Sequence, residues 1–237
     1  MIRIFEVYKN YVGKTVLNGV SFEVKPGEFV TLIGKIGSGK STIINIICGL
    51  VKPDSGQILY NGKRVDFSNR AYIKNIGFLL SGDYLIEDFS TILYWESIGR
   101  LLNLRRDYIE KRIKYLLDLC EISDPQKPIN QLSSGNKMLV KIGTMLINAP
   151  QILILDEPFI HLDIGEIFKI EKILLECHKA GNTIFITTHY PEPIFRISNE
   201  LLLLENGVIK DHLFVKEYAD YDSFRNNLSD YFKKGQD

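Results

Sequence analysis

The chain has 237 residues, of which 45% are hydrophobic and 24% are charged, and its 29 basic side chains balance its 29 acidic ones. These proportions are ordinary for a globular protein and exclude disorder as the main state of the chain. The zero net charge argues against a nucleic-acid-binding protein with a basic face, because phosphate affinity comes largely from Lys and Arg. We therefore expect one compact unit with an inserted subdomain, and no nucleic acid among its partners.

The sequence contains no signal for membrane insertion or for disulfide bonds. No apolar run reaches the length of about 20 residues that a membrane-spanning helix needs. Charged residues interrupt the first ten positions before the core of a signal peptide can form. Cys48, Cys120 and Cys177 are far apart in sequence and make no CxxC pair. We expect three buried free thiols in a reducing compartment, and no metal site made by them.

The first third of the chain predicts strands around a glycine-rich loop. Alternating apolar residues at 20–24 indicate a half-buried strand, and the continuous apolar run at 29–33 indicates a strand covered on both faces. A glycine-rich loop follows at 34–41, and then an apolar helix that ends before Gly49. Residues 57–65 predict two short strands that turn at Asn61-Gly62.

The remainder alternates between predicted strands and helices. Strands are expected at 76–80, 151–157 and 183–188. Helices are expected at 107–121, from the LSSGN segment to about residue 145, and at 165–179. A last hairpin is expected to turn at Asn206-Gly207. The alternation predicts an α/β fold with a mostly parallel sheet, in which the helical block from about 84 to 145 is an insertion. Residues from about 211 onward are mixed and polar, and they predict no element.

The loop at 34–41 has the spacing G-x-x-x-x-G-K-[ST], between a buried strand and a helix. Glycines allow the backbone to wrap closely around an anion, and the amide groups with the positive end of the helix hold phosphates. Lys40 is expected to reach the β- and γ-phosphates, and the Ser41 hydroxyl to ligate Mg²⁺. The predicted nucleotide-binding residues here are Gly34, Lys35, Ile36, Gly37, Ser38, Gly39, Lys40, Ser41 and Thr42.

Two adjacent carboxylates, Asp156 and Glu157, follow the buried run ILIL at 152–155. Burying a charged side chain is unfavourable unless the charge has a partner, and a bound MgATP would interact with both carboxylates. We expect Asp156 to bind Mg²⁺, and Glu157 to act as the general base that polarises water for attack on the γ-phosphate.

Taken in order, these motifs resemble those of the nucleotide-binding subunits of ABC ATPases, and the resemblance runs from about residue 5 to 210. GKIGSGKST (34–42) is similar to the Walker A loop and ILILDE (152–157) to Walker B. LSSGN (132–136) resembles the LSGGQ signature, 158–163 the D-loop, and His189 the switch histidine. The resemblance implies a P-loop NTPase with a RecA-like, mostly parallel sheet, an antiparallel β-subdomain and an inserted α-helical subdomain. It places the ATPase domain at 1–210 and leaves 211–237 as a short C-terminal extension.

The same resemblance implies a site shared by two copies. ATP would lie between the phosphate loop of one copy and Ser133, Ser134 and Gly135 of the other, with Tyr11 stacked on the adenine just before the first strands. His189 would contact the γ-phosphate. Ser133 is also expected to cap the helix that follows it. The implied cofactors are ATP and Mg²⁺, and the implied partners are a transmembrane permease subunit and a second cassette, in a homodimer or a heterodimer. The implied location is cytoplasmic, on the inner face of the cell membrane.

Three positions depart from the family pattern. Ser134 stands where glycine is usual, which costs about 1 kcal/mol if the backbone requires positive φ and almost nothing in a first helical turn. Ser81 stands where glutamine is usual, and its shorter side chain is expected to reach Mg²⁺ through water or to be a plain turn residue. His161 follows the Walker B segment and is interpreted as a D-loop residue at the interface, with a solvated side chain as the alternative.

The segment after Ser81 is rich in apolar and aromatic residues, expected to be mostly core of the helical insertion, with a few exposed members that form a groove for a permease helix. They are Tyr84, Leu85, Ile86, Phe89, Leu93, Tyr94 and Trp95. The helical segment at 90–104 resembles the exporter branch, so we expect the ATPase subunit of an exporter. The alternatives are a soluble ABC ATPase acting on ribosomes or DNA, and a P-loop kinase, which gives no reason for LSSGN or His189.

Overall fold

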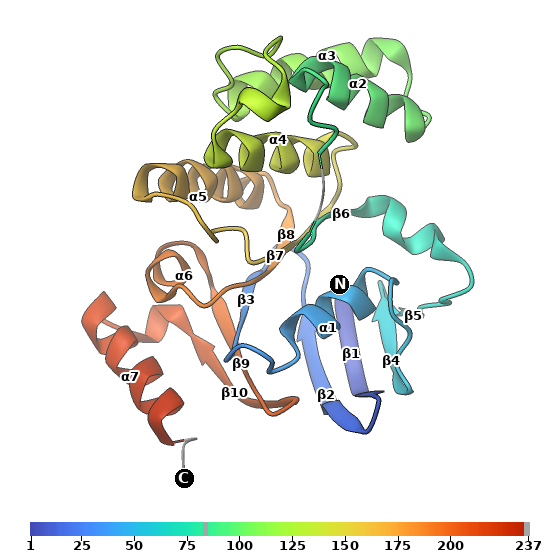
Figure 1. Cartoon of the computed structure of the whole chain (residues 1–237). Helices are drawn as coiled ribbons and strands as arrows, with labels where there is room; N and C mark the ends of the chain where they lie inside the picture. Colours follow the sequence, from blue (N-terminus) through green and yellow to red (C-terminus); the bar gives the residue numbers. More distant parts are fainter. Residues whose placement is uncertain (83–84, 235–237) are drawn as a thin grey trace.

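A computed structural model describes residues 1–82 and 85–234. In this part of the chain, a six-stranded sheet runs through the middle of the molecule, and all of its strands but β10 are parallel (Figure 1). In spatial order its strands are β10 (Val208–Phe214), β9 (Glu200–Glu205), β3 (Phe29–Ile33), β8 (Thr183–Thr187), β7 (Ile152–Asp156) and β6 (Ile76–Leu79). The predicted mostly parallel α/β sheet is confirmed.

The central strands are apolar throughout because both of their faces are covered. All residues of β3, β7 and β8 are buried. Alternate side chains of β7 enter two different cores. Leu153 and Leu155 pack with the helical part of the molecule. Ile152 and Ile154 pack with α1 (Lys40–Ile47) and the antiparallel sheet. The sheet thus separates two hydrophobic cores, and packing on both of its faces fixes the positions of its strand ends.

The antiparallel sheet at the lower right of Figure 1 contains four strands within the described residues. They are β2 (Lys14–Val24), β1 (Ile2–Tyr11), β4 (Ser55–Tyr60) and β5 (Lys63–Arg64), in that order. β1 was not expected, and the placement of Tyr11 before the first strands is wrong, because Tyr11 is the last residue of β1. A bulge breaks the strand's alternation: Glu6 has φ 46°, and the pairing with β2 shifts between Ile4 and Val7.

The helical subdomain stands above the sheet in Figure 1. It comprises α2 (Thr91–Leu101), α3 (Arg106–Leu119), the 3₁₀ turn η2 (Ile129–Gln131) and α4 (Ser134–Leu146), and the 3₁₀ segment η1 (Arg70–Asn75) precedes β6. Trp95 is fully buried, and its Nε1 donates to Val140 O at 3.0 Å and to Thr144 Oγ1 at 3.1 Å. The expectation that the aromatic segment is mainly core holds for Trp95 and Tyr94, whereas Ile86 and Leu93 are about half exposed. Tyr84 lies outside the described residues.

The C-terminal third adds α5 (Ile164–Lys179), α6 (Pro191–Ile197), the 3₁₀ turn η3 (Val215–Glu217) and α7 (Tyr221–Lys234). The sequence did not predict α7. Its Phe224 and Leu228 are buried against Ile33 and Leu201, which fixes the helix beside β3 and β9. None of the helices in the described ranges is long and apolar enough to cross a bilayer. The three cysteines are buried free thiols, as expected.

Candidate nucleotide-binding site

The loop at residues 34–39 joins the carboxyl end of β3 to the start of α1. Gly37 and Gly39 have φ values of 82° and 109°, which side-chain-bearing residues rarely adopt. A Cβ on Gly34 would collide with the carbonyl oxygen of Leu204. Ser38 Oγ is buried without a hydrogen-bond partner among the described residues. A buried hydroxyl of this kind calls for a polar ligand, and a phosphate oxygen at this loop would satisfy it.

Lys40 begins α1 and is almost fully buried. Its ammonium group donates to Gly34 O at 2.8 Å and to Lys35 O at 3.4 Å, so it folds back over its own loop. Glu157 Oε1 lies 3.6 Å from the same nitrogen. Of the other predicted residues of the loop, Lys35, Ile36 and Ser41 are exposed and Thr42 is half-buried.

Asp156 ends β7, and two hydroxyl groups from other elements hold its carboxylate. Ser81 Oγ donates to Oδ2, and Thr187 Oγ1 at the end of β8 donates to Oδ1, both at 2.5 Å. The Asp156 side chain is buried, so these bonds replace part of its hydration. The structure thus brings Ser81 to Asp156, as a metal-binding role for both would require.

The residues at this end of the sheet suit a magnesium ion. Mg²⁺ prefers oxygen ligands and is usually bound by one or two protein groups together with waters and substrate phosphates. Asp156 and Ser81 offer such oxygens, and Ser41 lies at the start of α1 beside the phosphate loop. No group of three or more His, Cys, Asp or Glu side chains in the described ranges could hold a metal alone.

Glu157 follows β7 in the left-handed region, with φ 53°. Its backbone N–H donates to both the carbonyl and the hydroxyl of Thr187, at 3.0 and 3.1 Å, which holds this uncommon conformation in place. Its carboxylate accepts from His189 Nδ1 at 2.9 Å on the side away from Lys40. The structure therefore joins Lys40, Glu157 and His189 in one chain of contacts.

The signature residues lie at the start of α4. Ser133 Oγ accepts from Asn136 N at 3.2 Å, so the predicted cap is present. Ser134 is the first residue of the helix, and its φ is not positive, which removes the strain considered for the serine at this position. A Cβ on Gly135 would collide with Glu166 of α5. Figure 1 shows α4 in the helical subdomain and α1, which the phosphate loop opens, on the other side of the sheet. One copy of the chain does not bring these motifs together.

Two further predicted residues lie at the surface. Tyr11 is 43% exposed, and the ammonium group of Lys9 stands 5.5 Å from its ring centroid. His161 is exposed and has φ 61°, in the turn between β7 and α5. Its neighbour Phe159 is fully buried and anchors that turn in the core.

Two residues near the site were not identified from the sequence. Thr187 forms hydrogen bonds with both Asp156 and Glu157. The sequence feature that could have identified it is its position at the end of a predicted buried strand. Arg225 has no such signal, because α7 was not predicted. It lines a cavity of about 300 Å³ together with Gly34, Lys35 and His189, so the C-terminal helix borders the phosphate loop.

Comparison with known proteins agrees with this geometry. The sequence model of the family described as ABC transporter matches residues 17–160. The cell division ATP-binding protein FtsE of Bacillus subtilis is 32% identical over 228 residues, which cover 94% of this chain and 100% of that protein. The Nod factor export ATP-binding protein I of Sinorhizobium fredii is 34% identical over 207 residues, covering 87% of this chain and 60% of that protein. Among solved structures, the dimeric ATP-binding cassette MJ0796 bound to ADP and Pi matches with a TM-score of 0.81 and 27% identity, covering 91% and 99% of the two chains.

Proposed function

The chain belongs to the ABC transporter family of ATP-hydrolysing subunits, and from this premise we propose how its residues bind MgATP and hydrolyse it between two cassettes. The observation that carries the proposal is the chain of contacts from Lys40 through Glu157 to His189 at the mouth of the phosphate loop. A lysine, a carboxylate and an imidazole at one anion-binding loop match the needs of phosphoryl transfer to water.

Binding of the triphosphate begins at the loop of residues 34–41. The Lys40 ammonium now donates to loop carbonyls, and phosphate oxygens are stronger acceptors, so the lysine turns from the loop to the β- and γ-phosphates. Ser38 and the amide groups at the start of α1 supply further donors. Tyr11, with its exposed ring, stacks on the adenine.

Magnesium supplies positive charge that neutralises the phosphates and aligns them for attack. Asp156, Ser41 and Ser81 are the residues that would hold it, Ser81 through water. Thr187 orients the Asp156 carboxylate, as groups behind a metal ligand commonly do.

Glu157 accepts a proton from the attacking water. Its carboxylate has one oxygen toward Lys40 and the other toward His189, so contacts on both sides hold it in position at the site. A carboxylate held in this way is suited to a general base, and His189 is then placed to contact the γ-phosphate.

The second half of the site comes from another copy of this chain or from a related cassette. Ser133, Ser134 and Gly135 open α4 on a part of the molecule distant from the phosphate loop, so a second copy is needed to bring them to the nucleotide. Apolar side chains are exposed on the segments that would meet: Ile36 in the phosphate loop, and Ile160 and Ile164 beside His161. Covering them is favourable, which supports a dimer that closes on ATP.

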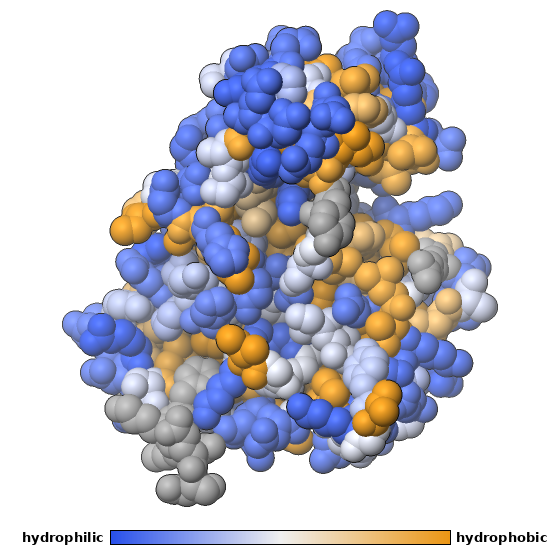
Figure 2. Space-filling model, viewed as in Figure 1, coloured by the Kyte–Doolittle hydropathy of each residue, from blue (hydrophilic) through white to orange (hydrophobic). Residues whose placement is uncertain are grey.

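A groove between the helical subdomain and the core supports a membrane partner. Its cavity measures about 820 Å³ and lies between α2 and α4 on one side and η1 and β6 on the other. Figure 2 shows hydrophobic residues on both sides of this region. Leu101 and Leu102, at the end of α2, are 77% and 48% exposed. An amphipathic helix from a transmembrane permease fits such a groove, which would hold the chain at the inner face of the membrane.

Export is the direction of transport that we propose, because the helical segment at 90–104 resembles the exporter branch of the family. Sequence identity does not distinguish export from other roles, because the export relative (34% identical) and the cell division relative (32% identical) are about equally similar to this chain. The substrate is set by the permease.

The test of the catalytic proposal is ATP turnover by the purified chain with and without Lys40→Ala. Loss of turnover is expected, since the lysine is the buried cation at the loop. Lys25→Ala is the control: the Lys25 side chain is exposed, and its ammonium group lies 3.6 Å from the carboxylate of Glu28. Equal turnover by Lys40→Ala and the unaltered chain would reject the site.

The permease proposal is tested by purification of the tagged chain from native membranes. We expect a polytopic membrane protein to co-purify, and Leu101→Glu in the groove to release it. Leu50→Glu, at another exposed leucine, should retain it. Recovery of ribosomal or DNA-repair proteins in place of a membrane protein would support the alternative of an ATPase that acts away from the membrane.

A further inference from the structure

A cavity of about 580 Å³ lies at the edge of the sheet where β7 and β8 begin, opposite the edge that carries the nucleotide site. Ile152 and Thr183, the first residues of β7 and β8, line it, whereas Asp156 and Thr187 at the other ends of the same strands hold the catalytic groups. The rest of the lining comes from α3, from the end of α4 and the segment that joins it to β7, from the end of α5 and the turn after it, from the turn after β4, and from Met1 and Pro26. All three parts of the molecule therefore meet at this cavity, which is within the size range of small-molecule sites.

Among the described side chains that line the cavity, that of Arg112 alone is charged. Its Nη2 donates to Leu146 O at 2.6 Å, and its guanidinium group stands 4.8 Å from the centroid of the Tyr115 ring. Among the described residues, no ion pair joins a carboxylate to Arg112, and its buried Nε has no hydrogen-bond partner there. A guanidinium group stays protonated under all ordinary conditions, so this half-buried cation lacks a counter-ion.

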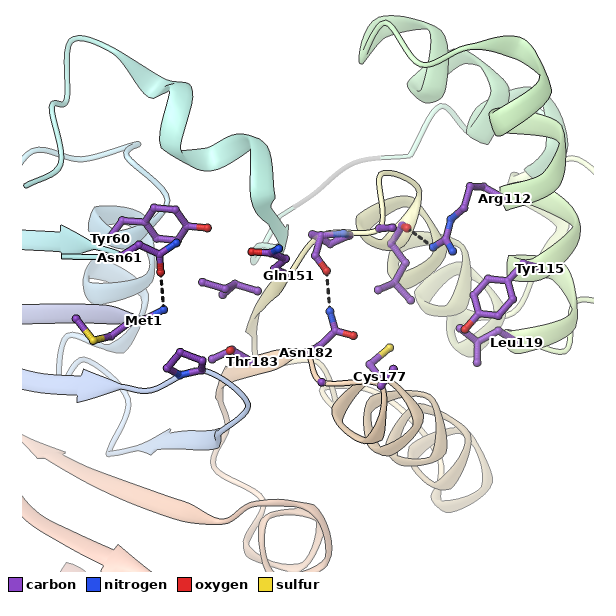
Figure 3. A pocket seen from close by; sticks show the side chains of 17 residues that line it. Met1, Tyr60, Asn61, Arg112, Tyr115, Leu119, Gln151, Cys177, Asn182 and Thr183 are labelled. Carbon is purple, nitrogen blue, oxygen red and sulfur yellow. Dashed lines mark hydrogen bonds between the residues drawn. The ribbon is translucent and has the colours of Figure 1, made fainter. Parts of the chain in front are cut away.

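Other polar groups of the lining also have unused hydrogen-bonding capacity. Tyr60 Oη is buried without a partner in the described part of the chain. Thr183 Oγ1 accepts from Gly27 N at 2.9 Å, which leaves its hydroxyl proton to donate. Figure 3 shows Tyr60 and Arg112 at opposite sides of the cavity, with Gln151, Asn182 and Thr183 between them. Folded proteins rarely leave buried polar atoms unpaired, so the lining favours a ligand that brings acceptors.

The apolar part of the lining sets the character of the rest of the ligand. Leu119, Leu146 and Pro150 contribute hydrophobic surface, and Tyr115 contributes a half-exposed ring. A bare inorganic ion would occupy only a small share of this volume and would leave that surface uncovered. A carboxylate or phosphate group on an organic body matches both the cation and the apolar wall.

We propose that this cavity is a binding site for a small organic anion, whose carboxylate or phosphate group pairs with Arg112 and whose apolar part packs on Leu119 and Leu146. The ligand bridges α3 of the helical subdomain and the first residues of β7 and β8. Its occupancy therefore ties the helical subdomain to the strands that carry the catalytic groups. The site is independent of ATP hydrolysis, and its absence would leave the proposed catalysis unchanged.

Calorimetric titration of the full chain with four probes tests the site: benzoate, phenyl phosphate, neutral benzamide and inorganic phosphate. We expect saturable binding of benzoate or phenyl phosphate in the millimolar range or tighter, and at least about tenfold weaker binding of benzamide, since hydrogen bonds to charged groups are the stronger ones. Whichever of the two aryl anions binds more tightly identifies the anionic group. The phenyl phosphate titration is repeated with Lys40→Ala, so that binding at the phosphate loop is separated from binding at Arg112.

Variants at α3 provide the decisive comparison. Arg112→Gln should weaken anion binding by about 10- to 100-fold, and Arg112→Lys should restore part of it. Arg106→Gln, on the same helix with an exposed side chain paired to Glu110, should bind like the unaltered chain. If Arg112→Gln does not fold, the ratio of benzoate to benzamide affinity in the unaltered chain decides. Equal affinity for the two, no saturable binding of either anion, or equal binding by a folded Arg112→Gln variant would overturn the proposal.

Discussion

Glu157 and His189 are joined by a 2.9 Å hydrogen bond between the carboxylate oxygen Oε2 and the ring nitrogen Nδ1. The bond links the turn after β7 to the residue two positions after β8. It fixes the carboxylate on one side while Lys40 approaches it from the other at 3.6 Å. The two strands are neighbours in the sheet, so their carboxyl ends deliver these groups to one place.

Glu157→Gln should lower ATP turnover by about 100- to 10,000-fold while ATP binding is retained, because the amide keeps the shape of the side chain and cannot accept the proton. Steady-state phosphate release and a nucleotide-binding assay measure the two effects separately. Glu110→Gln, on the exposed face of α3, is the matched control and should turn over ATP normally. Undiminished turnover by Glu157→Gln would show that another group is the base.

Thr187→Val should affect both stability and the magnesium requirement. It removes the hydroxyl that donates to Asp156 and that is one of the two acceptors for the Glu157 amide, which we expect to cost about 1–3 kcal/mol in the free energy of unfolding. The loss of a group behind a metal ligand should raise the magnesium concentration for half-maximal activity about tenfold or more. Urea unfolding and a magnesium titration of turnover measure these effects. Thr15→Val, at an exposed hydroxyl, should change neither, and a Thr187→Val variant with the same magnesium requirement as the parent would contradict the assignment.

The two serines of the signature should behave differently. Ser133→Ala removes a helix cap and should lower the free energy of unfolding by about 1 kcal/mol. It should also weaken ATP-dependent dimerisation, since the hydroxyl is proposed to face the nucleotide of the second copy. Ser134→Gly should bring no gain in stability, because Ser134 already has a helical backbone and glycine is the poorer helix former. Thermal unfolding and sedimentation with ATP report on both. A marked stabilisation by Ser134→Gly would contradict the geometry of this turn.

The buried thiols should be inert near neutral pH. Burial raises the pKa of Cys120 to about 12 and that of Cys177 to about 11. In the unfolded chain these thiols lose their protons near the ordinary pKa of about 8.5. Their contribution to stability is therefore constant below that pH and is lost as the pH rises toward the folded values. Urea unfolding at increasing pH should show this decline, and Cys120→Ala should reduce it. Rapid labelling of Cys120 or Cys177 in the folded chain by a thiol reagent near neutral pH would be inconsistent with their burial.

Much of the site was predictable because its functional residues directly follow apolar strands that can be recognised in the sequence. The phosphate loop follows a continuous apolar strand, and Asp156 and Glu157 follow another, so the fold places them at one edge of a parallel sheet. The turn at Asn206-Gly207 was also readable, and both residues have positive φ. These features depend on residues within a few positions of one another.

The parts that were missed depend on contacts between distant segments. In β1, the bulge at Glu6 interrupts the alternation of Ile2, Ile4 and Val7, which hides the strand. In α7, a mostly polar helix, Phe224 and Leu228 are buried and Tyr221 and Tyr231 pack beside them, while the partners Ile33 and Leu201 come from β3 and β9. The pairing of Ser81 with Asp156 spans 75 positions and has no local signature, so only the family resemblance placed Ser81 with Asp156 at the predicted magnesium site.

The most direct test of the shared nucleotide site is a structure of the Glu157→Gln variant with MgATP, determined under conditions in which the assembly stays intact. The account predicts two cassettes, with the γ-phosphate against Lys40 of one copy and against the Ser133 hydroxyl of the second cassette. A nucleotide bound at the loop of a single chain, with Ser133 facing solvent, or a nucleotide bound away from Lys40, would contradict it.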